Sequence, residues 1–182
     1  KTTPKTYILD KLKGWLLSAI IGGGLLSLII WFYIQTTTLF WIYAWALISS
    51  FSIFMVMFYS SLIVPLFNKQ TPLEAGDLRD AIEGFSNKVG FALNNIFVID
   101  GSKRSTKANA YFSGLGTKKR IVLFDTLITD LHIKELVAVL AHEIGHYKKK
   151  HTLIAIIFSI IQMGLMLFIL SFFISKPELS QA

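Results

Sequence analysis

Three uncharged apolar stretches constrain this 182-residue chain more than any other feature. They cover residues 15–34, 39–67 and 153–174, and none of them contains Asp, Glu, Lys, Arg or His. About 20 apolar residues span the hydrocarbon core of a bilayer, so each stretch predicts a transmembrane helix. One such stretch would also suit the core of a soluble protein, but three in a short chain are typical of a membrane protein. The first is long for the core of a signal peptide and lacks a small-residue cleavage site after it, so we expect it to be retained.

The charged residues indicate how these helices are oriented. The net charge is +7, and the connection between the first two stretches, residues 35–38, carries none of it. Because cytoplasmic flanks are enriched in Lys and Arg, we expect a multi-pass protein with its N-terminus and residues 68–152 on the cytoplasmic side. The charge therefore indicates a lipid bilayer as partner, and no nucleic acid. The flanking lysines are Lys5, Lys11, Lys13, Lys69, Lys148, Lys149 and Lys150.

Most of the charged side chains lie between the second and third stretches. The sequence thus predicts three regions: residues 1–67 with two transmembrane helices, a water-facing segment at 68–152, and a third helix with a tail at 153–182. The chain has no cysteine, which excludes disulfides and thiolate chemistry.

The water-facing segment predicts a small α+β fold. Thr71-Pro72 precedes acidic residues and a helical spacing of apolar ones, which indicates an amphipathic helix that starts there. "NIFVID" (95–100) reads as a strand, and "ANAYFSGL" (108–115) and "RIVLFD" (120–125) form a predicted hairpin across the turn "GTKK". From Leu131 the pattern is helical through the following histidines.

The loop "GSKRSTK" (101–107) is strongly basic. It is suited to attract anionic lipid or an acidic group of a substrate. A solvated loop that keeps a neighbouring strand soluble explains the same residues, and the sequence alone favours this second interpretation.

Residues 142–146 read "HEIGH", the H-E-x-x-H pattern. On a helix, His142 and His146 lie one turn apart on the same face, so both imidazoles can reach one zinc ion at about 2.0–2.1 Å. Glu143 projects beside the pair, where it is placed to take a proton from water activated by the metal. This is the arrangement of a zinc metalloprotease.

The third protein ligand of such a zinc is not evident in this chain. On a continuous helix His151 is rotated by about 140° from His146, and His132 lies about 15 Å before His142. Glu178 follows the third stretch and is expected on the opposite side of the membrane. We therefore expect this chain to be a fragment whose zinc site is completed by residues outside it.

Two runs of residues carry a family resemblance. "IFVIDGSKRSTKANAYFSGLGTKKRIVLFDTLI" followed by "ELVAVLAHEIGHYKKKH" closely resembles the CAAX prenyl protease (type I) family of integral-membrane zinc metalloendopeptidases. The resemblance covers about residues 62–155. HtpX-type proteases, which serve membrane protein quality control, share the H-E-x-x-H pattern and an N-A-rich strand but usually lack the long first run, so they are the second choice.

The resemblance implies an α-helical membrane protein with a small α+β, gluzincin-like metalloprotease segment, whose β-hairpin packs against the H-E-x-x-H helix. It implies that His142 and His146 bind one Zn²⁺ per full-length chain and that Glu143 is the general base. The third ligand is expected to be a glutamate on a later helix, and the oxyanion donors are also expected downstream. The fragment is then expected to be inactive.

The resemblance also implies a peptide or protein substrate that can be lipidated, since family members cut C-terminally prenylated proteins. The strand at 108–114 precedes the histidine helix and is suited to a sheet edge, where an extended substrate adds by main-chain pairing. Asn109, Ala110 and Tyr111 are the predicted substrate contacts, with Asn109 and Tyr111 on one face by the period of two. Pairing of this strand on both edges, with Tyr111 in the core, is the alternative.

A non-enzymatic membrane scaffold with incidental histidines is the alternative of a different class. Zinc content separates the two, because a scaffold would hold no stoichiometric metal and would not respond to His142→Ala.

Overall fold

The computed structural model describes residues 2–36, 38–91, 95–113 and 120–174. The chain divides into two compact units, one made of Lys1–Thr6 with Phe54–Thr152 and the other of Tyr7–Ile53 with Leu153–Ala182. The three regions expected from the sequence follow other boundaries and stay a prediction.

Three helices are long and apolar enough to cross a membrane: α1 (Pro4–Thr36), α2 with its short continuation α3 (Phe40–Leu62 and Val64–Phe67), and α7 (His151–Ile174). Most of their large apolar side chains are exposed, as expected for helices whose surroundings are lipid rather than water. The helix break at Ile63 has a local cause, because Pro65 has no N–H and its ring clashes with the carbonyl four residues before it.

Within the second unit, α2 and α7 pack together through an indole. The Nε1–H of Trp45 donates to the backbone oxygen of Ile160 at 2.8 Å, and the rings of Trp41 and Phe168 meet edge to face at 5.1 Å. A Cβ on Gly164 would lie 2.8 Å from Trp45 Nε1. Glycine is therefore needed at this position for the indole to approach the backbone of α7.

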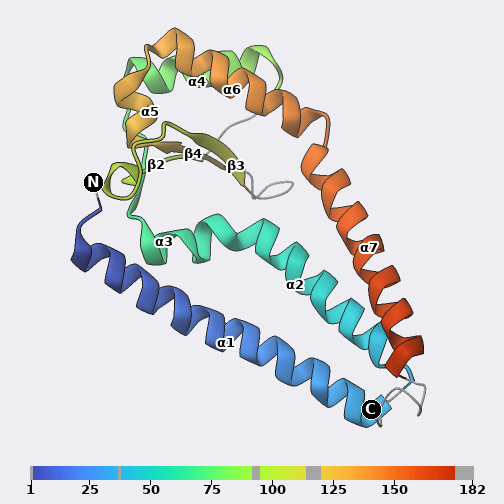
Figure 1. Cartoon of the computed structure of the whole chain (residues 1–182). Coiled ribbons are helices and arrows are strands. Elements are labelled where there is room, and N and C mark those ends of the chain that lie inside the picture. The colour runs from blue at the N-terminus through green and yellow to red at the C-terminus, as the bar shows by residue number, and fades with distance from the viewer. Residues whose placement is uncertain (1, 37, 92–94, 114–119, 175–182) are drawn as a thin grey trace. The chain divides into compact units, whose positions relative to one another are not determined.

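A four-stranded sheet lies at the centre of the first unit (Figure 1). Its strands are β1 (Gln70–Pro72), β2 (Ile96–Ile99), β3 (Ala110–Ser113) and β4 (Arg120–Phe124), in the order β1-β2-β4-β3. Strands β2 and β4 are parallel, and the other two pairs are antiparallel. The β3–β4 pairing confirms the predicted hairpin, whose "GTKK" turn lies outside the described residues.

Helices α4 (Asp77–Lys88), α5 (Asp125–Asp130) and α6 (Ile133–Lys148) cover one face of this sheet (Figure 1). Leu136, Leu140 and Ile144 recur every four residues on α6 and are all buried, which fixes one side of the helix against the core. On the sheet they meet Ile121 and Leu123, which have no exposed surface. The histidine helix thus packs against the hairpin, as predicted.

The opposite face of the sheet carries a smaller cluster. Val64, Ile99 and Val122 are buried there, with Tyr111 and Phe124 packed against them. Val64 belongs to α3, so the end of the second apolar helix is held directly to the sheet.

One predicted boundary is wrong. Thr71-Pro72 does not start a helix but lies in β1, where Thr71 pairs with Val98. The helix α4 begins five residues later, after Gly76, whose φ of 152° requires glycine. The long-range pairing with β2 offers residues 70–72 backbone hydrogen bonds that outweigh a local helix signal.

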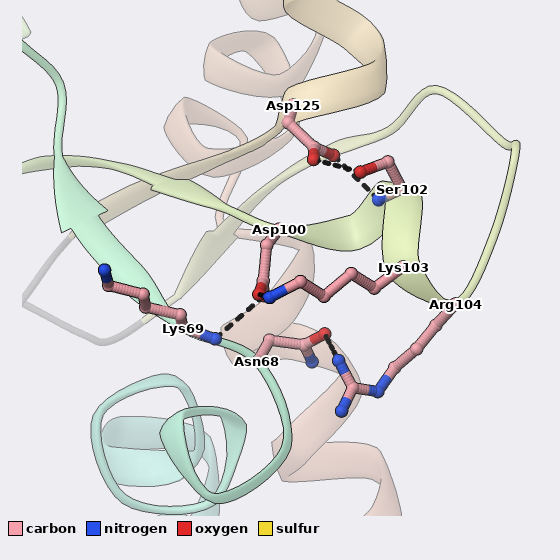
Figure 2. A network of polar contacts seen from close by, with 7 residues as sticks. All are labelled: Asn68, Lys69, Asp100, Ser102, Lys103, Arg104 and Asp125. Carbon is pink, nitrogen blue, oxygen red and sulfur yellow. Dashed lines mark hydrogen bonds and ion pairs between the residues drawn. The ribbon is translucent and has the colours of Figure 1, made fainter. Parts of the chain in front are cut away.

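Two carboxylates follow the carboxyl ends of the parallel strands (Figure 2). Asp125, after β4, accepts hydrogen bonds from the backbone N–H of Ser102 at 2.8 Å and from its hydroxyl. Burial acts to raise the pKa of Asp125, but these bonds and one from the Thr126 N–H outweigh it and hold the pKa below its usual value.

Asp100, after β2, ties the basic loop to the end of α3 (Figure 2). It accepts from the backbone N–H of Lys69 at 2.8 Å and pairs with Lys103 Nζ at 2.6 Å. The guanidinium of Arg104 donates to the side-chain oxygen of Asn68 at 3.1 Å. Two cations of the loop are therefore engaged within the chain, which supports the structural interpretation of this loop over a binding one.

Candidate metal centre

The two histidines of the H-E-x-x-H pattern lie together on α6. His142 Nε2 and His146 Nε2 are 3.0 Å apart, and both side chains are exposed. They lie two residues to either side of Ile144, which is about 200° around the helix from each. Because the buried residues hold the opposite side of α6 against the core, both imidazoles face away from the core.

This spacing fits a shared zinc ion. Two nitrogens bound to a tetrahedral zinc at about 2.0–2.1 Å lie about 3.3 Å apart, so the pair needs to separate by only a few tenths of an ångström. Neutral imidazole nitrogens that face one point are the donor set that zinc prefers in proteins. His142 and His146 are the residues that would hold the metal.

Glu143 lies between the two histidines in sequence and is half-buried. Its carboxylate makes no hydrogen bond or ion pair among the described residues. A carboxylate that is not engaged elsewhere is available as a proton acceptor.

No third group completes the site within the part of the chain that the structure describes, where no set of three or more His, Cys, Asp or Glu is placed to hold a metal. His132 caps the start of α6 in a reciprocal capping box with Glu135, which explains this histidine without a metal. Glu178 lies outside the described residues.

The position of His151 differs from the expectation of a continuous helix. The helix α6 ends at Lys148, and Lys150 adopts a left-handed φ of 56° before α7 begins at His151. This bend brings His151 Nδ1 to 2.7 Å from His146 Nδ1. Gly and Asn are the residues that commonly adopt the left-handed backbone conformation. A lysine gives no such signal, so the contact could not be predicted from the sequence.

Strand β3 is at one end of the described sheet and pairs only with β4. Ala110 is buried and faces the α6 side, whereas Tyr111 lies on the opposite face and meets Phe124 at 6.4 Å between ring centres. Asn109 precedes the strand; its side-chain oxygen accepts from the Ala110 N–H at 2.9 Å, and its backbone oxygen accepts from the Phe124 N–H at 3.0 Å.

A largely apolar pocket of about 440 Å³ opens beside this strand. Tyr111, Phe112 and Ser113 line it consecutively, together with Tyr59 from α2 and Tyr147 from α6. Three consecutive strand residues expose an edge rather than a face, since neighbouring side chains alternate between faces. Burial raises the pKa of Tyr111, so its phenol is a neutral hydrogen-bonding group near neutral pH.

Both parts of the chain match known protein families. Residues 72–180 match the family described as Peptidase family M48, and residues 1–69 match the CAAX prenyl protease N-terminal region of five membrane helices. The chain belongs to peptidase family M48. It is thus a membrane-embedded, multi-pass member of a peptidase family, and the predicted family resemblance is confirmed.

Relatives in this family extend over much more sequence than the present chain. The chain is 46% identical to CAAX prenyl protease 1 of Saccharomyces cerevisiae, over 87% of this chain and 35% of that relative. It is 45% identical to the CAAX prenyl protease 1 homolog of Arabidopsis thaliana, over 84% of this chain and 36% of the relative. The chain thus spans little more than a third of the length of each of these two relatives.

The fold agrees with a solved family structure. The crystal structure of S. mikatae Ste24p superposes with a TM-score of 0.85 at 46% identity, over 91% of this chain and 39% of that one. The expected architecture, a mostly helical membrane protein with a small sheet, is therefore confirmed.

Proposed function

We propose that the full-length protein is a zinc-dependent membrane endopeptidase of the CAAX prenyl protease type. The observation that carries this proposal is the pair of exposed Nε2 atoms of His142 and His146, 3.0 Å apart on α6, in a chain of family M48. In this proposal the two histidines hold one Zn²⁺, which supplies Lewis acidity to a peptide carbonyl and to water.

Glu143 acts as the general base. Its carboxylate takes the proton of the attacking water and passes it to the leaving amine. This role requires a carboxylate that is not engaged in other hydrogen bonds. The half-buried position of Glu143, directly after His142 in the sequence of α6, supports this role. The core contacts of α6 keep the three side chains in fixed relation, so little reorganisation accompanies the reaction.

A third ligand from a later helix of the full-length protein completes the metal site in this proposal. The two histidines alone would hold zinc loosely, because catalytic zinc normally has three protein ligands. The isolated 182-residue chain is then inactive as a peptidase. The small share of its relatives' length that the chain spans supports this proposal.

The substrate is a peptide or protein, lipidated substrates included, that pairs with the open edge of β3. Main-chain pairing fixes the scissile carbonyl without demanding particular side chains, as a protease requires. Asn109, Ala110 and Tyr111 are the proposed contacts, and the apolar pocket beside Tyr111 suits a hydrophobic side chain or lipid. Because the side chain of Ala110 lies in the core, only its backbone groups are available to contact the substrate.

The N-terminus and the segment 68–152 lie on the cytoplasmic side in this proposal. The support is the charge distribution, since the loop between the first two spans has no Lys or Arg, while lysines precede the first span, follow the second and precede the third.

A pair of peptides tests the substrate class. The full-length protein is given a C-terminally prenylated peptide and its unprenylated twin, and kcat/KM is measured for each. We expect cleavage to favour the prenylated peptide. Equal rates would contradict the lipid-linked function and favour general quality control of membrane proteins. Absence of cleavage together with absence of stoichiometric zinc would leave a scaffold as the function.

A further inference from the structure

His151 is a titratable group that the proposed catalytic machinery does not use. It is the first residue of α7 and is exposed. Its ring is 4.8 Å from that of His146 between ring centres, inclined at 72°, and their Nδ1 atoms are 2.7 Å apart. That distance is within hydrogen-bonding range for two imidazole nitrogens.

The contact depends on a specific break in the backbone. On a continuous helix the two side chains would diverge by about 140°. Instead α6 ends at Lys148, the backbone N–H of Lys149 bonds back to Gly145 at 3.0 Å, and Lys150 takes a left-handed φ of 56°. For a residue with a Cβ this conformation is energetically unfavourable. The chain thus adopts an unfavourable backbone conformation at Lys150, directly before the residue that contacts His146.

The two nitrogens of His146 face two different histidines. Nε2 faces His142, and Nδ1 faces His151. A neutral imidazole carries one proton, so a hydrogen bond that holds the proton on Nδ1 leaves the Nε2 lone pair free. The His146 Nδ1–H then donates to His151 Nδ1, and His151 carries its own proton on Nε2.

We propose that His151 is a positioning residue that fixes the tautomer and ring orientation of His146 for metal binding. The inference rests on the proposed zinc function. Histidine ligands commonly donate their second N–H to a neighbouring acceptor, and loss of that acceptor typically weakens metal binding by 10–100-fold. His151 supplies this acceptor from just beyond the bend. His142 shows no such partner among the described residues.

A second explanation is that His151 only closes the local turn at Lys149 and Lys150. In that case its removal destabilises the fold without a specific effect on zinc. Asparagine separates the two explanations, because its Oδ1 is attached to the side chain at the same place as Nδ1 of histidine and also accepts a hydrogen bond. Leucine has a similar bulk without any acceptor.

The test compares His151→Asn and His151→Leu in the full-length protein purified in detergent. Zinc affinity is measured by competition with a chelator, and the melting temperature of the metal-free protein reports folding. His132→Asn serves as the control, since it removes a histidine from the other end of α6 and leaves a good N-cap residue.

We expect His151→Leu to raise the zinc Kd by 10–100-fold, while His151→Asn and His132→Asn stay within about threefold of the wild type. The melting temperatures of metal-free His151→Leu and His151→Asn should agree. An unchanged Kd for His151→Leu, or equal losses for leucine and asparagine, would overturn the role of His151 while the zinc function stands. A wild-type protein without stoichiometric zinc would overturn the proposed function itself, and this inference with it.

Discussion

Glu143→Gln separates the proposed base from the proposed ligands. The substitution replaces one carboxylate oxygen by an amide of nearly the same shape, and Glu143 has no hydrogen bond among the described residues to lose. Folding and zinc content should therefore be unchanged. General-base catalysis contributes typically 10²–10⁴-fold in rate, which corresponds to about 3–5 kcal/mol of transition-state stabilisation. We expect kcat to fall by at least 100-fold with little change in KM.

The assay measures three quantities on the full-length protein: zinc per chain, kcat and KM with a peptide substrate. His142→Ala is the matched comparison, because it should lose metal and activity together. Loss of zinc from Glu143→Gln would make Glu143 a ligand or a structural group. Retention of more than one tenth of the wild-type kcat would exclude it as the base.

Three other substitutions test the fold and the substrate edge. Gly164→Ala should destabilise the protein by about 1–3 kcal/mol, because its Cβ would displace the Trp45 indole. Thermal melting in detergent measures this loss. Gly23→Ala is the control and should be neutral, because a Cβ there meets nothing within 4 Å. Asp125→Asn should lower the melting temperature at neutral pH. Because the pKa of Asp125 is lowered in the folded state, its stabilising effect is present above the usual aspartate pKa of about 3.9 and is lost as the pH falls through the folded value; a difference between variant and wild type that persists unchanged in acid would contradict this. Asn109→Ala should raise KM or lower kcat/KM and leave zinc content intact, and unchanged kinetics would remove Asn109 from the substrate site.

Local patterns were sufficient for the elements whose signal is local. The apolar runs predicted the long helices, and alternating β-formers around a glycine-containing turn predicted the hairpin. They failed where a distant partner decides the conformation. Thr71 became part of a strand because Val98, far along the chain, pairs with it. The contact of His151 with His146 depends on a left-handed lysine, and no propensity rule places one at Lys150.

The pattern of buried residues on α6 explains why the shared outward face of His142 and His146 could nevertheless be predicted from sequence. Leu136, Leu140 and Ile144 anchor one line of the helix in the core, so the rotational setting of α6 is determined by the same periodicity that is visible in the sequence. His142 and His146 then have to face outward, together and on a rigid support. In the proposed function, the groups that complete the site come from outside this helix. The Nδ1 partner of His146 lies beyond a bend, and the proposed substrate edge lies on β3, so both depend on tertiary arrangement rather than on the spacing within one helix.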